Sequence, residues 1–426
     1  MTSSAVGIGD LAVYIPQPCM NLDTLVAYRV NGDGMMGRRL RRAVESTGQR
    51  SMRYPQVWED NATLAAQAGH LLLNQNPELP LDKLRYIAVG TETSVDLSKP
   101  VAAYVEGMLQ TAGHKVPDSI STFQVQHACA GGTISIMSVG ALLRASAREG
   151  ETGMVICSDI ARYDIASTAE ITQGAGAVAM LVETNPRLVE LDIATQGYCS
   201  RDVDDFFRPL GSVTAKVKGG YSVQCYHEAL DAAFRDHCAR TGEEPADALH
   251  NTDMFVLHIP FQKMAWIAIH RLLSHHLKMT SDQIERFLSE RGFEAASEPA
   301  ARIGNIYSGA AYLSLAFYLK DRYETLGEEI VGKRILLASY GSGNTMSVMR
   351  GRVAKRAPEV IRRWDLNALW NRACSDRVEM YERWLDAPLD PEAYNRIVAA
   401  ESAAIPTGSF YLAGIRDDGY REYSFK

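Results

Sequence analysis

Short apolar runs alternate with longer stretches of helical periodicity along most of this chain, a pattern typical of an α/β protein whose sheet is covered by helices. In the first half, strands are predicted within 85–94, 153–163 and 174–183, and a buried helix follows the turn that begins at 127. Upstream of that turn, STFQV is a further short segment of strand character. The pattern therefore predicts a mixed α/β fold with a large buried core.

The order of elements then recurs. In the second half, 254–263 is predicted to be a strand that runs into a polar loop, 302–319 a turn followed by a buried helix, and 333–343 a strand that ends in a glycine turn. We interpret the chain as two similar α/β units, residues 1–185 and 186–426, with an active site between them. From about residue 355 the chain is rich in Arg, Glu and Trp, which predicts surface helices and a terminal hairpin with DDG as its turn.

The stretch HACAGGT, residues 127–133, places Cys129 at the predicted strand-to-helix turn. Unpaired amides and the dipole of a helix N-terminus lower the pKa of a thiol, and Gly131 and Gly132 let another group approach the backbone closely. Cys129 is therefore a candidate nucleophile. The alternative is that it is simply a small buried hydrophobic residue.

Polar residues stand at the matching ends of other predicted elements. Glu92 follows the strand before GTETS, His258 follows the run MFVL, Asn305 begins a helix, and Ser342 lies in a tight glycine turn. Taken singly, these could be a solvated carboxylate, a core histidine, an N-cap and a turn residue. Together with Cys129 they form a constellation suited to carbon-carbon bond formation on acyl thioesters.

Composition narrows the class of protein further. The chain has 426 residues, 46% hydrophobic, and a formal net charge of -7, which argues against a nucleic-acid partner although a local basic cluster can still bind a phosphate. The seven cysteines are scattered, so neither a disulfide nor a zinc site is predicted. No signal peptide and no apolar run of membrane-spanning length are evident. We therefore expect a cytoplasmic protein with no membrane partner.

Several motifs resemble, in order and spacing, those of hydroxymethylglutaryl-CoA synthase in the thiolase superfamily. They are GTETS, HACAGGT, SDIARY, TQGAGAVAM, DDFFRPLGS, LHIPFQKM, IGNIYSGAAYLSLAFYL and SYGSG. The resemblance covers nearly the whole chain. The chain departs from the family pattern after the cysteine, where Ala130 replaces the more familiar tyrosine, and we expect that change to adjust the pocket shape more than the chemistry.

The resemblance implies a five-layered αβαβα fold made of two related halves, a homodimer, no metal, and no cofactor beyond the coenzyme A thioesters that serve as substrates. Cys129 would accept the acetyl group of acetyl-CoA, and Glu92 would remove a methyl proton from the acetyl-enzyme. The enolate would attack acetoacetyl-CoA, with His258, Asn305 and Ser342 fixing that substrate. The product, 3-hydroxy-3-methylglutaryl-CoA, belongs to the mevalonate pathway to isoprenoids.

Further substrate-binding residues follow from the same resemblance. Tyr163, Thr172 and Phe206 are expected to line the acyl pocket, although by their own chemistry they could be core residues. Cations are needed for the phosphates of coenzyme A, and an exposed basic run is more usually a solvated helix face. The candidates are Lys263, Arg42 with its neighbours Arg38, Arg39 and Arg41, and Lys216 and Lys218.

Two other functions remain open at this point. The first is a polyketide β-branching homologue, which would use the same catalytic residues but take its acetyl group from an acyl carrier protein and act on a tethered ketide. The second is a catalytically silent binding protein with the same fold. The complete set of Cys, Glu, His and Asn argues against the silent protein, and turnover with free acetyl-CoA separates the two enzymes.

Overall fold

The computed structural model describes residues 5–30, 33–146, 148–370, 373–375, 377–388 and 390–426. Within these residues a 10-stranded sheet has the order β12-β13-β14-β8-β1-β7-β6-β4-β5, with β9 paired to β14. Most of its longer strands read as continuous apolar runs because helices cover both faces. They are β1 (Val6–Tyr14), β4 (Leu84–Gly90), β5 (Ser121–Val125), β6 (Thr152–Ile160), β7 (Ala175–Thr184), β8 (Val189–Leu191), β9 (Gly197–Ser200), β12 (Met254–Leu257), β13 (Arg334–Gly341) and β14 (Thr345–Val353).

The predicted repeat is confirmed by strand pairing. In the first half, β4 pairs parallel to β6, and β6 pairs antiparallel to β7. In the second half, β12 pairs parallel to β13, and β13 pairs antiparallel to β14. The last α-helix before the second parallel strand is buried in each half: α5 (Gly131–Ser146) precedes β6 in the first, and α11 (Ala310–Leu326) precedes β13 in the second. The short strand β8 pairs with both β1 and β14 and joins the halves.

Alternate residues of β7 show how the layers are arranged. Val178 and Met180 pack into the cluster that contains α5, whereas Ala179 and Leu181 pack into the cluster that contains α3 (Asn61–Gln75). Because successive side chains of a strand point to opposite faces, α5 and α3 lie on opposite sides of this half of the sheet. The hydroxyl groups of Thr133 and Tyr312 lie 2.6 Å apart, which places α5 against α11.

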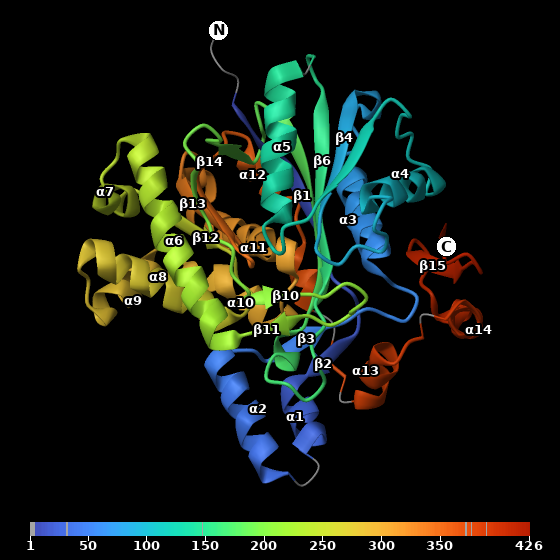
Figure 1. Ribbon diagram of the computed structural model, residues 1–426. Helices are drawn as coiled ribbons and strands as arrows, with labels where there is room; N and C mark the ends of the chain where they lie inside the picture. The colour runs from blue at the N-terminus through green and yellow to red at the C-terminus, as the bar shows by residue number, and fades with distance from the viewer. Residues whose placement is uncertain (1–4, 31–32, 147, 371–372, 376, 389) are drawn as a thin grey trace.

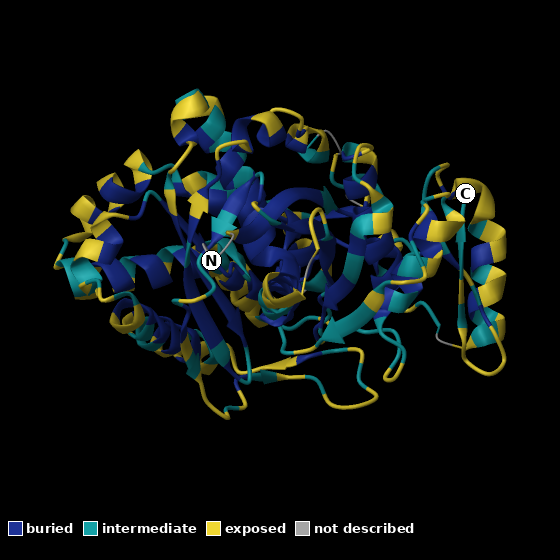
Figure 2. Ribbon diagram, turned by 90° about the horizontal axis from the view of Figure 1, so that it is seen from above, coloured by how far each residue is buried: buried dark blue, intermediate teal, exposed yellow. Residues whose placement is uncertain are grey.

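The outer layers complete the five-layered αβαβα arrangement that the sequence predicts. With α3, α4 (Val101–Thr111) covers the first half, and α6 (Gly219–Thr241) packs on β9, β13 and β14 of the second. Figure 1 shows these groups on opposite sides of the molecule, and Figure 2 shows the buried residues gathered between them. The remaining helices of the second half are α7 (Pro245–His250), α8 (Gln262–Leu277), α9 (Ser281–Glu290), α10 (Phe293–Ile303) and α12 (Ala357–Ile361).

Peripheral elements extend this body at two places. Helices α1 (Leu22–Val30) and α2 (Gly34–Thr47) project at the bottom of Figure 1, and β2 (Cys19–Asn21) pairs with β3 (Ser51–Arg53) at their base. The C-terminal part forms α13 (Val378–Leu385), α14 (Pro391–Glu401) and the predicted hairpin of β15 (Phe410–Ile415) and β16 (Arg421–Phe425). A small pair, β10 (Phe206–Phe207) and β11 (Lys216–Val217), lies beside the second half.

Two expectations need correction. The segment 128–146, which contains α5, does reach the length and hydropathy that could cross a membrane, contrary to the prediction. Its position between the sheet and α11 identifies it as a core helix, because burial between layers also selects apolar residues.

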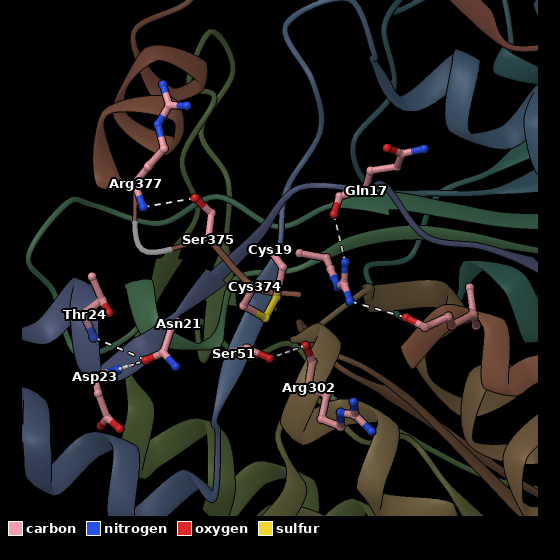
Figure 3. The surroundings of a disulfide bond; sticks show 12 residues. Gln17, Cys19, Asn21, Asp23, Thr24, Ser51, Arg302, Cys374, Ser375 and Arg377 are labelled. Carbon is pink, nitrogen blue, oxygen red and sulfur yellow. Dashed lines mark hydrogen bonds between the residues drawn. A yellow bond between two sulfur atoms is a disulfide. The ribbon is translucent and has the colours of Figure 1, made fainter. Parts of the chain in front are cut away.

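The prediction of no disulfide is also wrong. Cys19 on β2 and Cys374 form a disulfide across a sequence separation of 355 residues (Figure 3). Their meeting depends on the backbone contact beside them, where Ser375 N–H donates to the carbonyl of Cys19. Spacing along the chain contains no sign of such a contact. The other five cysteines are free.

Candidate active site

A cavity of about 310 Å³ lies where the two halves meet, at the ends of the equivalent strands. Residues from α2, α6 and the segment after β12 form its walls. Seven of the residues singled out in the sequence line it: Cys129, Tyr163, Thr172, Phe206, His258, Asn305 and Ser342. The two halves therefore meet at one pocket, as the sequence predicts.

Cys129 stands two residues before the first residue of α5 and is 8% exposed. The turn is held closely against β4, because a Cβ added at Gly90 would lie 2.2 Å from the amide nitrogen of Gly132. Glycine at both positions lets the cysteine turn pack directly beside the loop that carries Glu92.

The thiol of Cys129 has a raised pKa, not the lowered one expected from the helix N-terminus. Burial raises its pKa well above the usual value, and the nearby carboxylates of Glu92, Asp159 and Asp205 raise it further. The guanidinium of Arg208 opposes them. Cys129 is therefore a neutral thiol at neutral pH, because burial and the nearby carboxylates outweigh the effect of Arg208.

Glu92 does not line the cavity but is buried beside it, with its side chain 7% exposed. Arg208 holds it at two atoms: Nη2 lies 3.0 Å from the carboxylate Oε1 and Nη1 donates to the backbone carbonyl at 2.9 Å. Burial and the charge of Asp159 raise the pKa of Glu92 to about 8, and Arg208 lowers it. The second oxygen, Oε2, has no hydrogen-bond partner among the described residues.

Asp159, at the end of β6, organises this corner of the site. Its Oδ1 accepts from the Glu92 backbone N–H at 3.0 Å and from the hydroxyl groups of Thr91 and Thr93, each at 2.7 Å. Its Oδ2 accepts from the N–H and hydroxyl of Ser308, at 3.0 and 2.5 Å. One buried carboxylate thereby joins the Glu92 loop to the turn before α11.

His258 follows β12, where its N–H donates to the carbonyl of Ala338 at 2.8 Å. The imidazole is 3% exposed and packs near the rings of Tyr226 and Tyr340. Burial lowers the pKa of His258 to about 3, so its ring is neutral at physiological pH. A neutral ring offers one N–H donor to a substrate oxygen.

Asn305 and Ser342 occupy matching turns in the second half. Asn305 Oδ1 accepts from the Tyr307 N–H at 2.9 Å, so the residue caps a short turn as well as facing the cavity. The Asn305 side chain also hydrogen-bonds that of Tyr163, so two residues of the cavity lining hold each other in place. Ser342 directly follows β13, in a turn held by Asp205, which accepts from Tyr340 OH at 2.8 Å and from Gly343 N–H at 2.9 Å.

Aromatic side chains form the inner wall. Tyr163, Phe206 and Tyr307 meet edge to face, with ring centroids 5.8 to 6.5 Å apart. Tyr163 and Tyr307 belong to the same buried cluster as Cys129. Thr172 ends a short 3-10 turn and accepts, through its carbonyl, the N–H of Asn305. The aromatic side chains therefore place apolar surface next to the Cys129 thiol, and the bond to Thr172 fixes Asn305 in the same wall.

The basic candidates lie outside the cavity. Lys263 Nζ donates to the carbonyl of Glu45 at 2.6 Å, Lys216 pairs with Asp164, and Lys218 pairs with Asp204. Helix α2 carries the arginine run on its exposed surface, and Ala43, Ser46 and Thr47 of the same helix line the cavity. Within the described residues, Arg38, Arg39, Arg41 and Arg42 form no ion pair.

Asp159, Asp205, Arg208 and Tyr307 were missed in the sequence. Asp159 had a signal, since it is a carboxylate at the end of the apolar run MVICSDI, matched in position to the strand that precedes Glu92. Asp205 and Arg208 stand in the motif DDFFRPLGS, on either side of Phe206, but nothing local in that motif indicates a contact with a residue as distant in sequence as Glu92. Another cluster, of Asp231, His275 and His276, brings ligand-type atoms within 4.8 Å of one another, but the Asp231 oxygens already pair with His276 and Arg235.

Known proteins with related sequences and structures cover nearly the whole chain. Family models for the N-terminal and C-terminal parts of hydroxymethylglutaryl-coenzyme A synthase match residues 2–186 and residues 189–298 and 277–426. Hydroxymethylglutaryl-CoA synthase of Enterococcus faecalis is 28% identical over 387 residues, which is 91% of this chain and 93% of that protein. The mitochondrial enzyme of Homo sapiens is 29% identical over 393 residues, 83% of this chain and 74% of that protein.

Solved structures agree. MvaS in complex with 3-hydroxy-3-methylglutaryl coenzyme A superposes with a TM-score of 0.84 at 33% identity, over 99% of both chains. The HMG synthase of the curacin biosynthetic pathway superposes with a TM-score of 0.83 at 22% identity, over 99% of this chain and 100% of that one, a level that shows the thiolase-like fold alone. With both halves matched by the family models, this chain belongs to the hydroxymethylglutaryl-CoA synthase family.

Proposed function

We propose that this protein is a hydroxymethylglutaryl-CoA synthase that condenses acetyl-CoA with acetoacetyl-CoA through an acetyl-Cys129 intermediate. The observation that carries the proposal is one pocket in which Cys129, His258 and Asn305 meet, with the carboxylate of Glu92 buried beside it. The complex of the 33% identical relative with 3-hydroxy-3-methylglutaryl coenzyme A supports a coenzyme A thioester as ligand.

In the first half-reaction the Cys129 sulfur attacks the thioester carbonyl of acetyl-CoA and coenzyme A leaves. The thiol proton ends on the departing sulfur, so the exchange creates no net charge. This balance suits a pocket that already holds several carboxylates and raises the pKa of the thiol. The proposal assigns stabilisation of the oxyanion that forms during the exchange to backbone amides around Cys129 and Ser342.

In the second half-reaction Glu92 takes a proton from the methyl group of the acetyl-enzyme, and the resulting enolate carbon attacks the ketone of acetoacetyl-CoA. A general base works best when its pKa lies near the working pH, and the pKa of Glu92 is about 8. His258, with a pKa of about 3, is a poor base but a suitable N–H donor to the ketone oxygen. Asn305 offers a second donor through its amide.

The alkoxide formed in the attack takes the proton that Glu92 removed from the methyl group and becomes the tertiary alcohol, which returns Glu92 to its carboxylate form. Water then hydrolyses the thioester to Cys129, which releases the free carboxylate of the product and restores the thiol. Neither step needs a group beyond side chains and water. The proposal therefore needs only the carboxylate of Glu92, the imidazole of His258, the thiol of Cys129 and water.

For the phosphates of coenzyme A, the proposal favours α2. Arg39 and Arg42 each lie four residues before a cavity-lining residue, Ala43 and Ser46, so they share the helix face that borders the pocket. Lys263 lies at the contact between α2 and α8, where it can approach the same region.

A homodimer and a place in the mevalonate pathway follow as parts of the same proposal. The edge strand β5 supports the dimer, because at the end of the sheet it pairs only with β4 among the described residues and most of its residues are partly exposed. The cytoplasmic location stays a prediction.

The test mixes purified protein with radiolabelled acetyl-CoA and then adds acetoacetyl-CoA. We expect label on Cys129 after the first addition and labelled 3-hydroxy-3-methylglutaryl-CoA after the second. Cys129→Ala removes both, whereas Cys225→Ala, a buried cysteine outside the cavity, retains both. Label on another residue would contradict the assignment. Acylation by acetyl-acyl carrier protein but not by acetyl-CoA would favour the polyketide enzyme instead.

A further inference from the structure

Helix α13 contacts the wall of the acyl pocket from outside, although none of its residues lines the cavity. Its Tyr381 is fully buried, at 0% exposure, in a cluster with residues of α1 and α2. Figure 1 shows α13 beside α1, far along the chain from the catalytic motifs. A helix from the last part of the chain is therefore in a position to act on the site indirectly.

A short chain of hydrogen bonds links α13 to the pocket. The hydroxyl of Tyr381 accepts from Gln173 Nε2 at 2.5 Å, and Gln173 Oε1 accepts from the backbone N–H of Tyr163 at 2.7 Å. Gln173 is 2% exposed and does not line the cavity, whereas Tyr163 does. The NH₂ group and the carbonyl of the Gln173 side chain thus link α13 to the pocket wall.

Gln173 also touches the other side of the pocket. It directly follows Thr172, whose carbonyl accepts the Asn305 N–H at 3.0 Å. The backbone packing is equally close, since a Cβ added at Gly304 would lie 1.8 Å from the carbonyl oxygen of Gln173. A shift of Gln173 would therefore reach Tyr163, Thr172 and Asn305 together.

At the α13 end, this chain of hydrogen bonds is anchored by buried ion pairs. Tyr381 OH donates to Glu170 Oε1 at 3.1 Å, and Glu170, 1% exposed, pairs with Arg29 at 2.7 Å. Arg29 also pairs with Glu382, the neighbour of Tyr381 on α13, at 2.5 Å. Because the carboxylate accepts the hydroxyl hydrogen, the tyrosine oxygen is left to accept from Gln173.

A second contact reaches the same segment. Arg162 Nη2 donates to the carbonyl of Leu385, at the end of α13, at 2.7 Å, and its guanidinium lies 4.8 Å from the centroid of the Trp384 ring. Arg162 directly precedes Tyr163. The two contacts hold residues 162 and 163 against one helix.

We propose that Tyr381 and Gln173 are positioning residues through which α13 sets the place of Tyr163 beside Cys129. Tyr163 and Cys129 pack in the same buried cluster, so a displaced tyrosine changes the space in which the acetyl group is bound and transferred. The kinetic consequence rests on the proposed synthase activity; the structural consequence, a looser segment 161–174, does not.

The test compares two tyrosine-to-phenylalanine variants in the full-length protein. Tyr381→Phe removes the hydroxyl that joins Gln173 to Glu170. Tyr394→Phe is the matched control, because Tyr394 is a buried tyrosine of α14 whose hydroxyl donates only to backbone carbonyls of Val57 and Leu412. For each we measure hydrogen–deuterium exchange of segment 161–174, the single-turnover rate of Cys129 acetylation, and the Michaelis constants.

We expect Tyr381→Phe to raise amide exchange in 161–174 by about tenfold and to slow acetylation by about tenfold, with Michaelis constants changed less than about twofold, because misplacement lowers the rate more than binding. Gln173→Ala should change amide exchange and the acetylation rate in the same way. The double variant should change them little further, since both substitutions break the same chain of hydrogen bonds. Unchanged exchange in Tyr381→Phe, or equal effects in Tyr394→Phe, would overturn the proposal. If the wild type is not acetylated, the synthase assignment fails while the exchange result still decides the positioning role.

Discussion

Removing the cation beside Glu92 should move the pH dependence of condensation to higher pH. Arg208 contacts the carboxylate at 3.0 Å and is the influence that lowers its pKa, against burial and Asp159, which raise it to about 8. The carboxylate acts as base only when ionised, so the rate rises as pH passes through this pKa. Arg208→Met, which keeps an unbranched apolar stem but removes the charged guanidinium, therefore shifts the rising limb of the pH–rate profile to higher pH.

The size of the shift follows from the geometry. A cation in contact with a buried carboxylate lowers its pKa by roughly 1–3 units, so its loss raises the pKa of Glu92 by a similar amount. At pH 7 the ionised fraction then falls about tenfold for each unit. Condensation at that pH should decrease between about tenfold and about a thousandfold and recover toward alkaline pH.

The assay measures condensation from pH 6 to 10 after Cys129 has been acetylated, together with deuterium uptake by the acetyl methyl group. Arg201→Met is the control, because Arg201 is an exposed arginine paired with Glu228 and makes no contact with Glu92. An Arg208→Met profile that coincides with wild type, or one displaced to lower pH, would refute the reasoning. A shift seen equally in Arg201→Met would show a nonspecific effect of lost charge.

Three further outcomes are expected. Glu92→Gln should still acetylate Cys129 but lose condensation by about a hundred- to ten-thousandfold, and loss of acetylation would make Glu92 structural. Arg42→Ala and Lys263→Ala should raise the Michaelis constant for a coenzyme A thioester about three- to tenfold, with little change in turnover. Arg41→Ala, on the other side of α2, should leave this constant unchanged, and steady-state kinetics of the three variants test the difference. Cys19→Ser should lower the free energy of unfolding by roughly 2–5 kcal/mol in denaturant titrations, and an unaltered midpoint would show that the Cys19–Cys374 bond does not stabilise the fold.

Several elements of the fold could be predicted because local pattern decided them. The strands β4, β6, β7 and β13 are continuous apolar runs bounded by polar or glycine turns, and their spacing exposes the repeat without any knowledge of contacts. Candidate residues at the ends of these strands could also be named, because equivalent strand ends of two similar units meet at one place. Cys129, His258 and Asn305 do line one cavity.

The ionisation state of the site could not be predicted in the same way. The position of Cys129 before a helix suggested a lowered pKa, but burial raises it, and so do carboxylates that come from three separate segments. Arg208, which pairs with Glu92, is 116 residues away from it along the chain. A pKa depends on burial and on every nearby charge, and both are properties of the assembled fold.

The order of apolar runs and polar strand ends in the sequence by itself determined the α/β class, the repeat and the candidate residues at the strand ends, and the resemblance of the motifs to a known family gave the roles of base and donors. Tertiary structure alone decided the disulfide between Cys19 and Cys374, the hub at Asp159, and the link from Tyr381 to Tyr163. The reason is physical: hydrophobic periodicity is local, whereas hydrogen bonds and ion pairs of buried groups depend on which distant segments the packing brings together.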